Sequence, residues 1–242
     1  MRFLTASLLL LISHFAFAGA DYAREQKWAD EVVPGIVVGD PVYLESNKGH
    51  KFLTLLTEAP QAKVGLVVIH GVGIHPDWGM VGTLRSQLAE QGYTTLSIQM
   101  PVLANDAKSE EYDSLFDEAA ERIDIAVDFL KAKGFQKVAI VSHSMGSAMS
   151  HYYVEKNQSK LLAWASLGMG HGYTYASIHI PVLDLYGQND LALVLSLAKQ
   201  RAASLKENVQ SKQAMVLKSD HFYNNHETEM VHEVKQFLDG IK

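Results

Sequence analysis

Ser144 stands between a β-branched apolar segment and a helical pattern, in the run Ser142-His143-Ser144-Met145-Gly146. Small residues two places before and two places after a serine permit the tight strand-to-helix turn that lifts its hydroxyl out of a sheet. Such a hydroxyl attacks carbonyl carbons only when a base takes its proton. Ser142 occupies a position where this turn usually carries glycine, so the run alone also fits an ordinary strand-to-helix turn. A nucleophile at this position requires a base and an acid elsewhere in the chain.

Three other polar motifs each follow a predicted strand. They are His-Gly-Val-Gly at 70–73 after the strand at 64–69, Gly-Gln-Asn-Asp at 187–190 after the strand at 180–186, and Ser-Asp-His-Phe at 219–222 after the strand at 213–217. In open α/β sheets, ligands bind outside the carboxyl ends of the strands. The sequence therefore predicts that serine, acid and histidine gather at one edge of the sheet, in that chain order.

His221 is the predicted base, and Asp190 would hold its imidazole in the tautomer that accepts the proton of Ser144. Each assignment has a rival of the same residue type. Ser142 lies on the strand side of the turn and is expected to face the core, and Asp184 lies within a predicted strand. The other rivals are His226, at the start of the last predicted helix, and Asp220, expected to be a solvated loop residue.

Length and composition restrict the class of protein. The chain has 242 residues, of which 48% are hydrophobic, and this is enough for one sizeable core. It contains no cysteine, which excludes disulfides, thiolate metal sites and a cysteine nucleophile. The net charge is −6 without a basic tract, so no nucleic-acid partner is expected. The histidines lack the spacing of a His-Glu-x-x-His site, and we expect neither a metal nor a cofactor.

Residues 1–18 have the pattern of a secretory signal peptide. Arg2 precedes an apolar run that ends in a small-x-small cleavage pattern, and cleavage after either Ala18 or Ala20 fits it. The run is shorter than the ~20 apolar residues that a membrane span needs. We therefore expect an exported protein, periplasmic or secreted, without stable membrane insertion after cleavage.

The rest of the chain is expected to form an irregular entry segment at 19–40 and a single domain at 41–242. Predicted strands at 41–46 and 51–57 flank a turn, which indicates a hairpin at the edge of a sheet. From residue 63 onward, short apolar runs alternate with amphipathic helical patterns. This alternation predicts an α/β fold, doubly wound, with a mostly parallel sheet and helices on both faces.

On these motifs, residues 41–240 resemble an α/β-hydrolase, a family in which serine, acid and histidine follow in this order. The runs at 70–78 and 83–93 further resemble an uncharacterised group of exported bacterial α/β-hydrolases. The resemblance implies an oxyanion hole made by the backbone N–H groups of Met145 and Val72. It also places the base at His221 rather than His226, and gives His70 a structural role in its loop.

Many members of this family insert a helical lid after the sixth core strand. Only residues 168–179 separate the strand predicted to end near Leu167 from the next one, so we expect no lid and an open site. This segment and the stretch 100–112 would form its walls. The candidates for lining the pocket are His143, His171 and Tyr173.

These observations predict an exported serine hydrolase that cleaves carboxylic esters through an acyl-enzyme, with a small-molecule ester or acyl substrate. An open site suits short esters or the exposed chain end of a larger substrate. A peptidase or a perhydrolase would use the same residues. The alternative of another class is a non-catalytic binding protein on the same scaffold, to which Ser142 in place of glycine gives some support.

Overall fold

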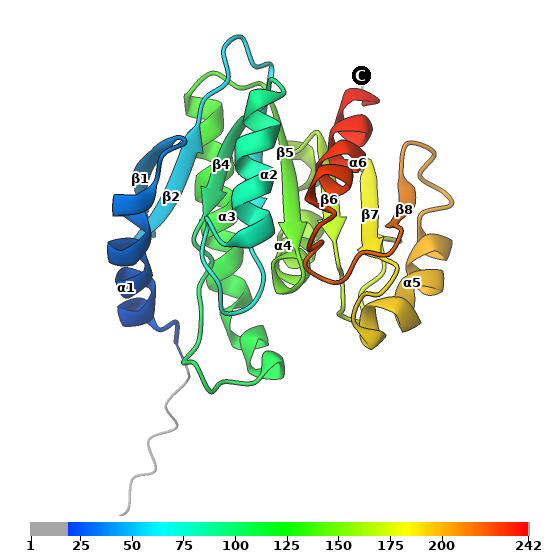
Figure 1. The fold of residues 1–242 in the computed structure, drawn as a ribbon, viewed down its shortest axis with the longest axis horizontal. Helices are drawn as coiled ribbons and strands as arrows, with labels where there is room; N and C mark the ends of the chain where they lie inside the picture. Colours follow the sequence, from blue (N-terminus) through cyan, green and yellow to red (C-terminus); the bar gives the residue numbers. More distant parts are fainter. Residues whose placement is uncertain (1–18, 242) are drawn as a thin grey trace, which may run out of the picture.

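The computed structural model describes residues 19–241, which form an eight-stranded sheet with helices on both faces (Figure 1). The signal peptide predicted at residues 1–18 lies outside the described part, so this assignment and the export that it implies stay predictions. The strands are β1 (Asp40–Glu45), β2 (Lys51–Thr57), β3 (Val64–Ile69), β4 (Thr94–Ile98), β5 (Lys137–His143), β6 (Ala163–Leu167), β7 (Val182–Gly187) and β8 (Lys212–Val216).

The strand order is β1-β2-β4-β3-β5-β6-β7-β8. Strand β2 runs antiparallel to both of its neighbours, and all the other pairs are parallel. The fold is therefore the predicted mostly parallel α/β sheet, with the predicted hairpin at one edge. In this arrangement the carboxyl ends of β3, β5, β6, β7 and β8 lie along the same edge of the sheet.

The helices are α1 (Tyr22–Val32), α2 (Gly79–Glu90), α3 (Phe116–Ala132), α4 (Met145–Asn157), α5 (Ala192–Ser204) and α6 (Glu227–Asp239). Three short 3-10 segments accompany them: η1 (Val33–Gly35), η2 (Ser109–Leu115) and η3 (Gln158–Lys160). Segment η2 ends at Leu115 and leads directly into α3, which begins at Phe116.

The core consists of two apolar layers, one on each face of the sheet. Helices α3 and α4 pack on one face, where the apolar side chains of α3 contact strand residues such as Val67 and Ile140. Helices α2 and α6 pack on the other face, against alternate residues of the same strands such as Val68 and Val141. Because both faces of the central strands are covered, β3 and most of β5 are continuous apolar runs rather than alternating ones.

Helix α1 corrects the irregular segment predicted at residues 19–40. It lies beside β1 and β2, in blue at the left of Figure 1. Asp21 caps it by accepting a hydrogen bond from the backbone N–H of Arg24 at 3.0 Å. The buried Glu25 of this helix receives two hydrogen bonds from Arg122 of α3, at 2.9 and 3.1 Å. A buried carboxylate is favourable only with such a partner, so α1 is fixed by a contact between residues 97 apart in sequence.

The connection between β6 and β7 contains no helix in the described structure, as predicted from its length. The carboxyl edge of the sheet is thus without a lid domain. Among residues 19–241, no helix is both long and apolar enough to cross a membrane.

We expect Glu25→Ala to lower the free energy of unfolding by about 2–3 kcal/mol, because it removes one of the two carboxylates that pair with the buried Arg122 guanidinium and leaves only Glu118. The matched control is Glu31→Ala, on the exposed side of the same helix, whose 3.9 Å pair with Lys27 is solvated. That change should stay within about 0.5 kcal/mol. Urea unfolding followed by circular dichroism measures both, and equal losses for the two variants would contradict the role given to Glu25.

Candidate active site

The turn from β5 into α4 holds Ser144 in a strained backbone conformation, with φ 55° and ψ −121°. Its backbone N–H donates to the carbonyl oxygen of Leu167 at 2.8 Å, which fixes the turn to the end of β6. Gly146 is required on the helix side, because a Cβ there would lie 2.2 Å from the carbonyl oxygen of His70. The predicted tight strand-to-helix turn is therefore formed, and it presents the hydroxyl of Ser144 at the carboxyl edge of the sheet.

Ser142 does not compete with Ser144 for the role of nucleophile. Its side chain is 1% exposed and accepts a hydrogen bond from the indole N–H of Trp164 at 2.8 Å. The hydroxyl of Ser147 lies 3.2 Å from the hydroxyl of Ser142. A serine in place of glycine thus fits this turn because a buried indole donor and a second hydroxyl satisfy it.

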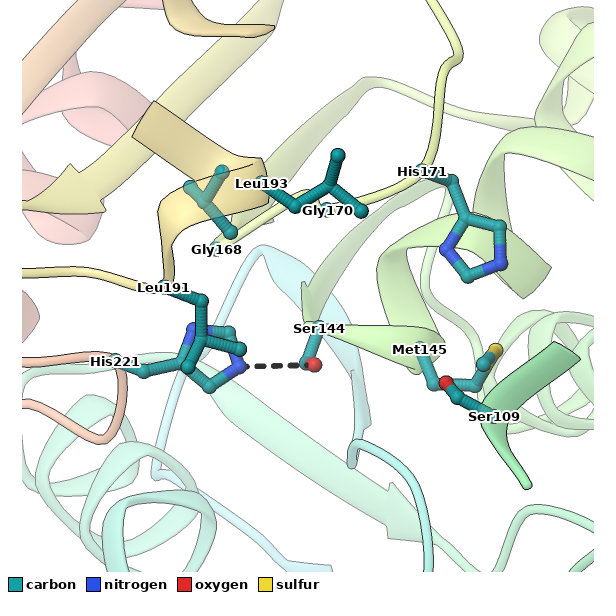
Figure 2. Close-up of a pocket in the computed structure, with 10 residues that line it drawn as sticks. Ser109, Ser144, Met145, Gly168, Gly170, His171, Leu191, Leu193 and His221 are labelled. Carbon is teal, nitrogen blue, oxygen red and sulfur yellow. Dashed lines mark hydrogen bonds between the residues drawn. The ribbon is translucent and has the colours of Figure 1, made fainter. Parts of the chain in front are cut away.

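The side chains of Ser144, His221 and Asp190 form one hydrogen-bonded chain. The hydroxyl of Ser144 lies 2.9 Å from Nε2 of His221, as the dashed line in Figure 2 shows. Nδ1 of the same imidazole lies 2.6 Å from a carboxylate oxygen of Asp190. Because an ionised carboxylate can only accept, Nδ1 carries the proton and Nε2 is free to accept one from the serine. The structure thus brings together the three residues that the sequence motifs singled out.

Asp190 is held ionised beside the imidazole. Burial alone would raise the pKa of its carboxyl, but hydrogen bonds from His221 and from the backbone N–H groups of Gly187 and Leu191 outweigh burial and lower it. These two backbone bonds also fix the carboxylate in the turn after β7.

The rival acids and histidine lie elsewhere. Asp184 is buried within β7, where both of its carboxylate oxygens accept from Nε of Arg201. Asp220 accepts hydrogen bonds within its own loop, including the backbone N–H of Asn224. His226 precedes α6 and faces Glu229 at 3.5 Å. None of these three residues takes part in the chain that ends on Ser144.

The two backbone groups predicted to form an oxyanion hole, Val72 N–H and Met145 N–H, donate to no other residue in the described structure. His70 fixes the loop that carries Val72. Its Nδ1–H donates to the carbonyl oxygen of Gly71 at 2.8 Å, and its Nε2 accepts from the backbone N–H of Met100 at 2.9 Å. The structural role predicted for His70 agrees with these contacts.

Helix α1 also reaches this loop. The guanidinium of Arg24 donates to the carbonyl oxygens of Leu103 at 2.7 Å and Gly73 at 3.4 Å, and to the side chain of Asn105 at 3.0 Å. One cation therefore joins the loop after β3 to the loop after β4. No sequence pattern pointed to Arg24, because its acceptors are backbone groups and a residue about 80 positions away.

A cavity of about 120 Å³ opens beside the Ser144 hydroxyl. Its lining comprises Ser109, Ser144, Met145, Gly168, Gly170, His171, Leu191, Leu193, Val194 and His221. Of the three predicted lining residues, only His171 belongs to it. The prediction that Tyr173 lines the pocket is wrong, because its ring is stacked on His151 and on the outer side of the lining residue His171, with ring centroids 4.5 and 5.8 Å apart.

His143 also lies outside the cavity, contrary to prediction, because its ring is buried behind His221. The two ring centroids are 4.6 Å apart, and Nε2–H of His143 donates to the backbone carbonyl oxygen of His221 at 2.9 Å. Burial, reinforced by the neighbouring imidazole of His221, lowers the pKa of His143 to about 3. His143 is thus a neutral support that positions the loop carrying His221.

Sequence reasoning missed the leucines at the start of α5. Leu191 and Leu193 are more than half exposed, and they lie directly after the acid of the hydrogen-bonded chain. The sequence signal that could have found them is the continuous apolar run at 191–195, which has no helical periodicity and directly follows the predicted acid. Arg201 joins their helix to the opposite wall, because its Nη1 donates to the carbonyl oxygens of both Met169 and Val194.

A family model described as the alpha/beta hydrolase fold matches residues 66–193, which is more than half of the chain. The chain belongs to this family. Among solved structures, an α/β serine hydrolase without lid from Xanthomonas campestris is similar, with a TM-score of 0.69 and 13% identity over 84% of this chain and 95% of that one. Est1E from Butyrivibrio proteoclasticus, in a structure with ferulic acid bound, gives a TM-score of 0.70 and 15% identity over 83% and 98% of the two chains.

Two curated relatives are both called Protein ABHD14A. The mouse protein (Mus musculus) is 26% identical over 151 residues, which are 60% of this chain and 58% of the relative. The zebrafish protein (Danio rerio) is 29% identical over 137 residues, 54% of this chain and 49% of the relative. The chain therefore spans only about half the length of these relatives. Both are vertebrate proteins, so they give no support to the predicted resemblance to exported bacterial hydrolases.

We expect the folded protein to lose stability as the pH falls below about 6.5. Burial lowers the pKa of His70 and of His143 to about 3, whereas an unfolded histidine titrates near 6.5. Between these values the unfolded chain binds more protons, so the free energy of unfolding decreases as the pH falls. Two such groups predict a loss of roughly 2–3 kcal/mol between about pH 7.5 and 5.5 in urea unfolding.

The variant His143→Gln checks the assignment, because glutamine keeps a donor for the His221 carbonyl and does not titrate. Its loss over the same pH range should be smaller by about 1 kcal/mol. A loss equal to that of the wild type would show that His143 is not held neutral by the fold.

Proposed function

We propose that this hydrolase cleaves carboxylic esters through an acyl-enzyme intermediate on Ser144. The observation that carries the proposal is the chain from Ser144 through His221 to Asp190, whose two contacts fix the tautomer that a base requires. Membership of the α/β hydrolase fold family, and similarity to solved structures that include a dienelactone hydrolase from Anabaena variabilis, support a hydrolytic reaction. That structure is 16% identical, with a TM-score of 0.68, over 83% of this chain and 96% of that one.

In the first half of the reaction, Nε2 of His221 takes the hydroxyl proton while Oγ of Ser144 forms a bond to the ester carbonyl carbon. Negative charge develops on the carbonyl oxygen, and the free N–H groups of Val72 and Met145 are the donors available for it. The imidazolium that forms is stabilised by the ionised Asp190. It then gives its proton to the alkoxide as the bond to the leaving alcohol breaks.

In the second half, water replaces the alcohol. Nε2 of His221 takes a proton from this water, whose oxygen bonds to the acyl carbon, and the same donors hold the second oxyanion. Collapse of this intermediate breaks the bond to Oγ of Ser144, which recovers its proton from the imidazolium. The products are a carboxylic acid and an alcohol, and the site returns to its starting state.

The alternative of a non-catalytic binding protein rested on Ser142 in place of glycine. Because the indole of Trp164 satisfies this hydroxyl within the turn, the replacement does not disturb the position of Ser144. Nothing in the geometry of the site therefore favours the non-catalytic alternative.

A fluorophosphonate probe should label the wild type and should fail to label Ser144→Ala. The matched control is Ser142→Ala, which removes a buried hydroxyl two residues away and should still be labelled. Intact-mass spectrometry measures the adduct and peptide mapping places it. Labelling of Ser144→Ala, or an unlabelled wild type, would overturn the proposal.

Asp190→Asn should lower the turnover of p-nitrophenyl esters by about 10³–10⁴, because an amide can donate to Nδ1 and so favours the wrong imidazole tautomer. Asp220→Asn is the control, because the carboxylate of this neighbouring acid accepts its hydrogen bonds from Phe222 and Asn224 of the same loop and not from the His221 ring. It should keep activity within a few-fold of the wild type. Comparable losses in the two variants would remove Asp190 from the mechanism.

A further inference from the structure

The cavity beside Ser144 has an apolar wall and an adjacent stretch of bare backbone. Met145, Leu191, Leu193 and Val194 supply the apolar side chains, and Gly168 and Gly170 supply the backbone. In Figure 2, Gly170 and Leu193 lie above Ser144, and Met145 lies to the right of Ser144. Such a lining favours a hydrocarbon group over a charged one.

The acyl group is the part of an ester that fits this cavity. It stays bonded to Oγ of Ser144 through both halves of the proposed reaction, and Ser144 itself lines the cavity. The alcohol must depart and water must replace it, so the leaving group needs the side that is open to solvent. The walls formed by α5 and residues 168–171 therefore serve the acyl chain.

The volume limits the length of that chain. A protein cavity of ~150 Å³ holds a benzene molecule, with its six carbons. At about 120 Å³, the cavity beside Ser144 takes an acyl chain of roughly four carbons. Each methylene buried there should raise kcat/KM about fourfold. Methylenes beyond the cavity should add little, because the hollow of about 330 Å³ that adjoins it past Gly170 is lined in part by the carboxylates of Glu110 and Asp113 and opens to solvent.

Two glycines line this cavity, and only one of them is required by the backbone. Gly168 has φ +58°, and a Cβ there would lie 2.9 Å from Cε1 of His221, so a side chain at 168 would displace the imidazole. Gly170 has no such constraint. A Cβ at 170 would meet only Cγ2 of Val194, at 3.5 Å, which is ordinary van der Waals contact. The missing side chain at 170 therefore leaves room for a ligand rather than relieving strain.

We propose that Gly170 sets the acyl-chain length and that the substrates are esters of short-chain carboxylic acids, from acetyl to butyryl. The inference rests on the proposed function of Ser144 as an acyl-forming nucleophile. Gly170 is a specificity-determining residue here: a side chain at this position occupies the space that the third and fourth acyl carbons use.

The experiment measures kcat/KM for p-nitrophenyl acetate, butyrate, hexanoate and octanoate, with the Ser144→Ala rate subtracted. For the wild type, butyrate should exceed acetate by roughly fifteenfold, because it buries two more methylenes, with no further gain for hexanoate or octanoate. Gly170→Ala should lower the butyrate-to-acetate ratio about fourfold, and Gly170→Val should lower it about tenfold or more. The matched control is Gly172→Ala, two residues along and outside the cavity, where a Cβ meets no atom within 4 Å. It should keep the wild-type ratio.

The outcomes separate this inference from the proposed function. If the wild type hydrolyses none of the esters, the function proposed for Ser144 fails, and the inference fails with it. If it hydrolyses them but favours octanoate, or if both Gly170 variants keep the wild-type ratio, only the inference is overturned. Fluorophosphonate labelling of Ser144 in Gly170→Val tests whether this variant retains an intact site. If Gly170→Val is not labelled, the butyrate-to-acetate ratio of Gly170→Ala alone tests the inference.

A second arm varies the alcohol at constant acyl group, with acetates of methanol, butanol and phenol. The Gly170 variants should change these relative rates by less than twofold. A larger change here than in the acyl series would assign the cavity to the leaving group and overturn the inference.

Discussion

The position of Ser144 depends on one backbone constraint, the close approach of three strand ends around a residue with positive φ. A non-glycine residue in such a conformation costs about 1–3 kcal/mol and persists only where its surroundings determine it. Here β6 accepts the Ser144 N–H through Leu167, and the chain after β3 leaves no room for a side chain at Gly146. The register of β3, β5 and β6 therefore fixes where the hydroxyl lies, and the core on both faces of the sheet fixes the register.

The order of the strands then determines where the other two residues of the hydrogen-bonded chain lie. Strands β7 and β8 continue the parallel sheet beyond β6, so their carboxyl ends bring Asp190 and His221 to the same edge. Both side chains are nearly buried, and ionic contacts are stronger where water is excluded. Two buried residues support this edge. His143 donates a hydrogen bond to the backbone carbonyl of His221, and Arg201 joins the two walls of the cavity through hydrogen bonds to Met169 and Val194.

Much of this arrangement could be predicted from the sequence, because its signals are local. Apolar runs mark buried strands, and polar motifs at their ends mark the residues that share an edge, so Ser144, Asp190 and His221 could be named from the chain alone. Helix α1 could not be predicted in this way. Its buried side chains include Glu25, whose burial makes sense only once Arg122, far along the chain, is placed beside it.

The cavity lining was hard to predict for a related reason. The sequence indicated that histidines and tyrosines lie near Ser144, but it gave no direction for their rings. His143 follows the alternation of β5 into the interior, and the ring of Tyr173 is stacked between His151 and His171. Gly170 carries no side chain at all, so no pattern of residue types could assign it a place in a binding site.

Helix α1 also determines where this domain can be cut. The hydrolase pattern in the sequence begins at residue 41, and a recombinant fragment designed on that pattern would start there. Such a fragment would expose Leu53 and Leu55, which pack against Ala29, and would leave the Arg122 guanidinium buried without Glu25. It would also release the carbonyl of Gly73 from Arg24. The smallest piece that keeps its core and the loop at 70–73 intact therefore begins no later than Ala20, about twenty residues before the hydrolase pattern does.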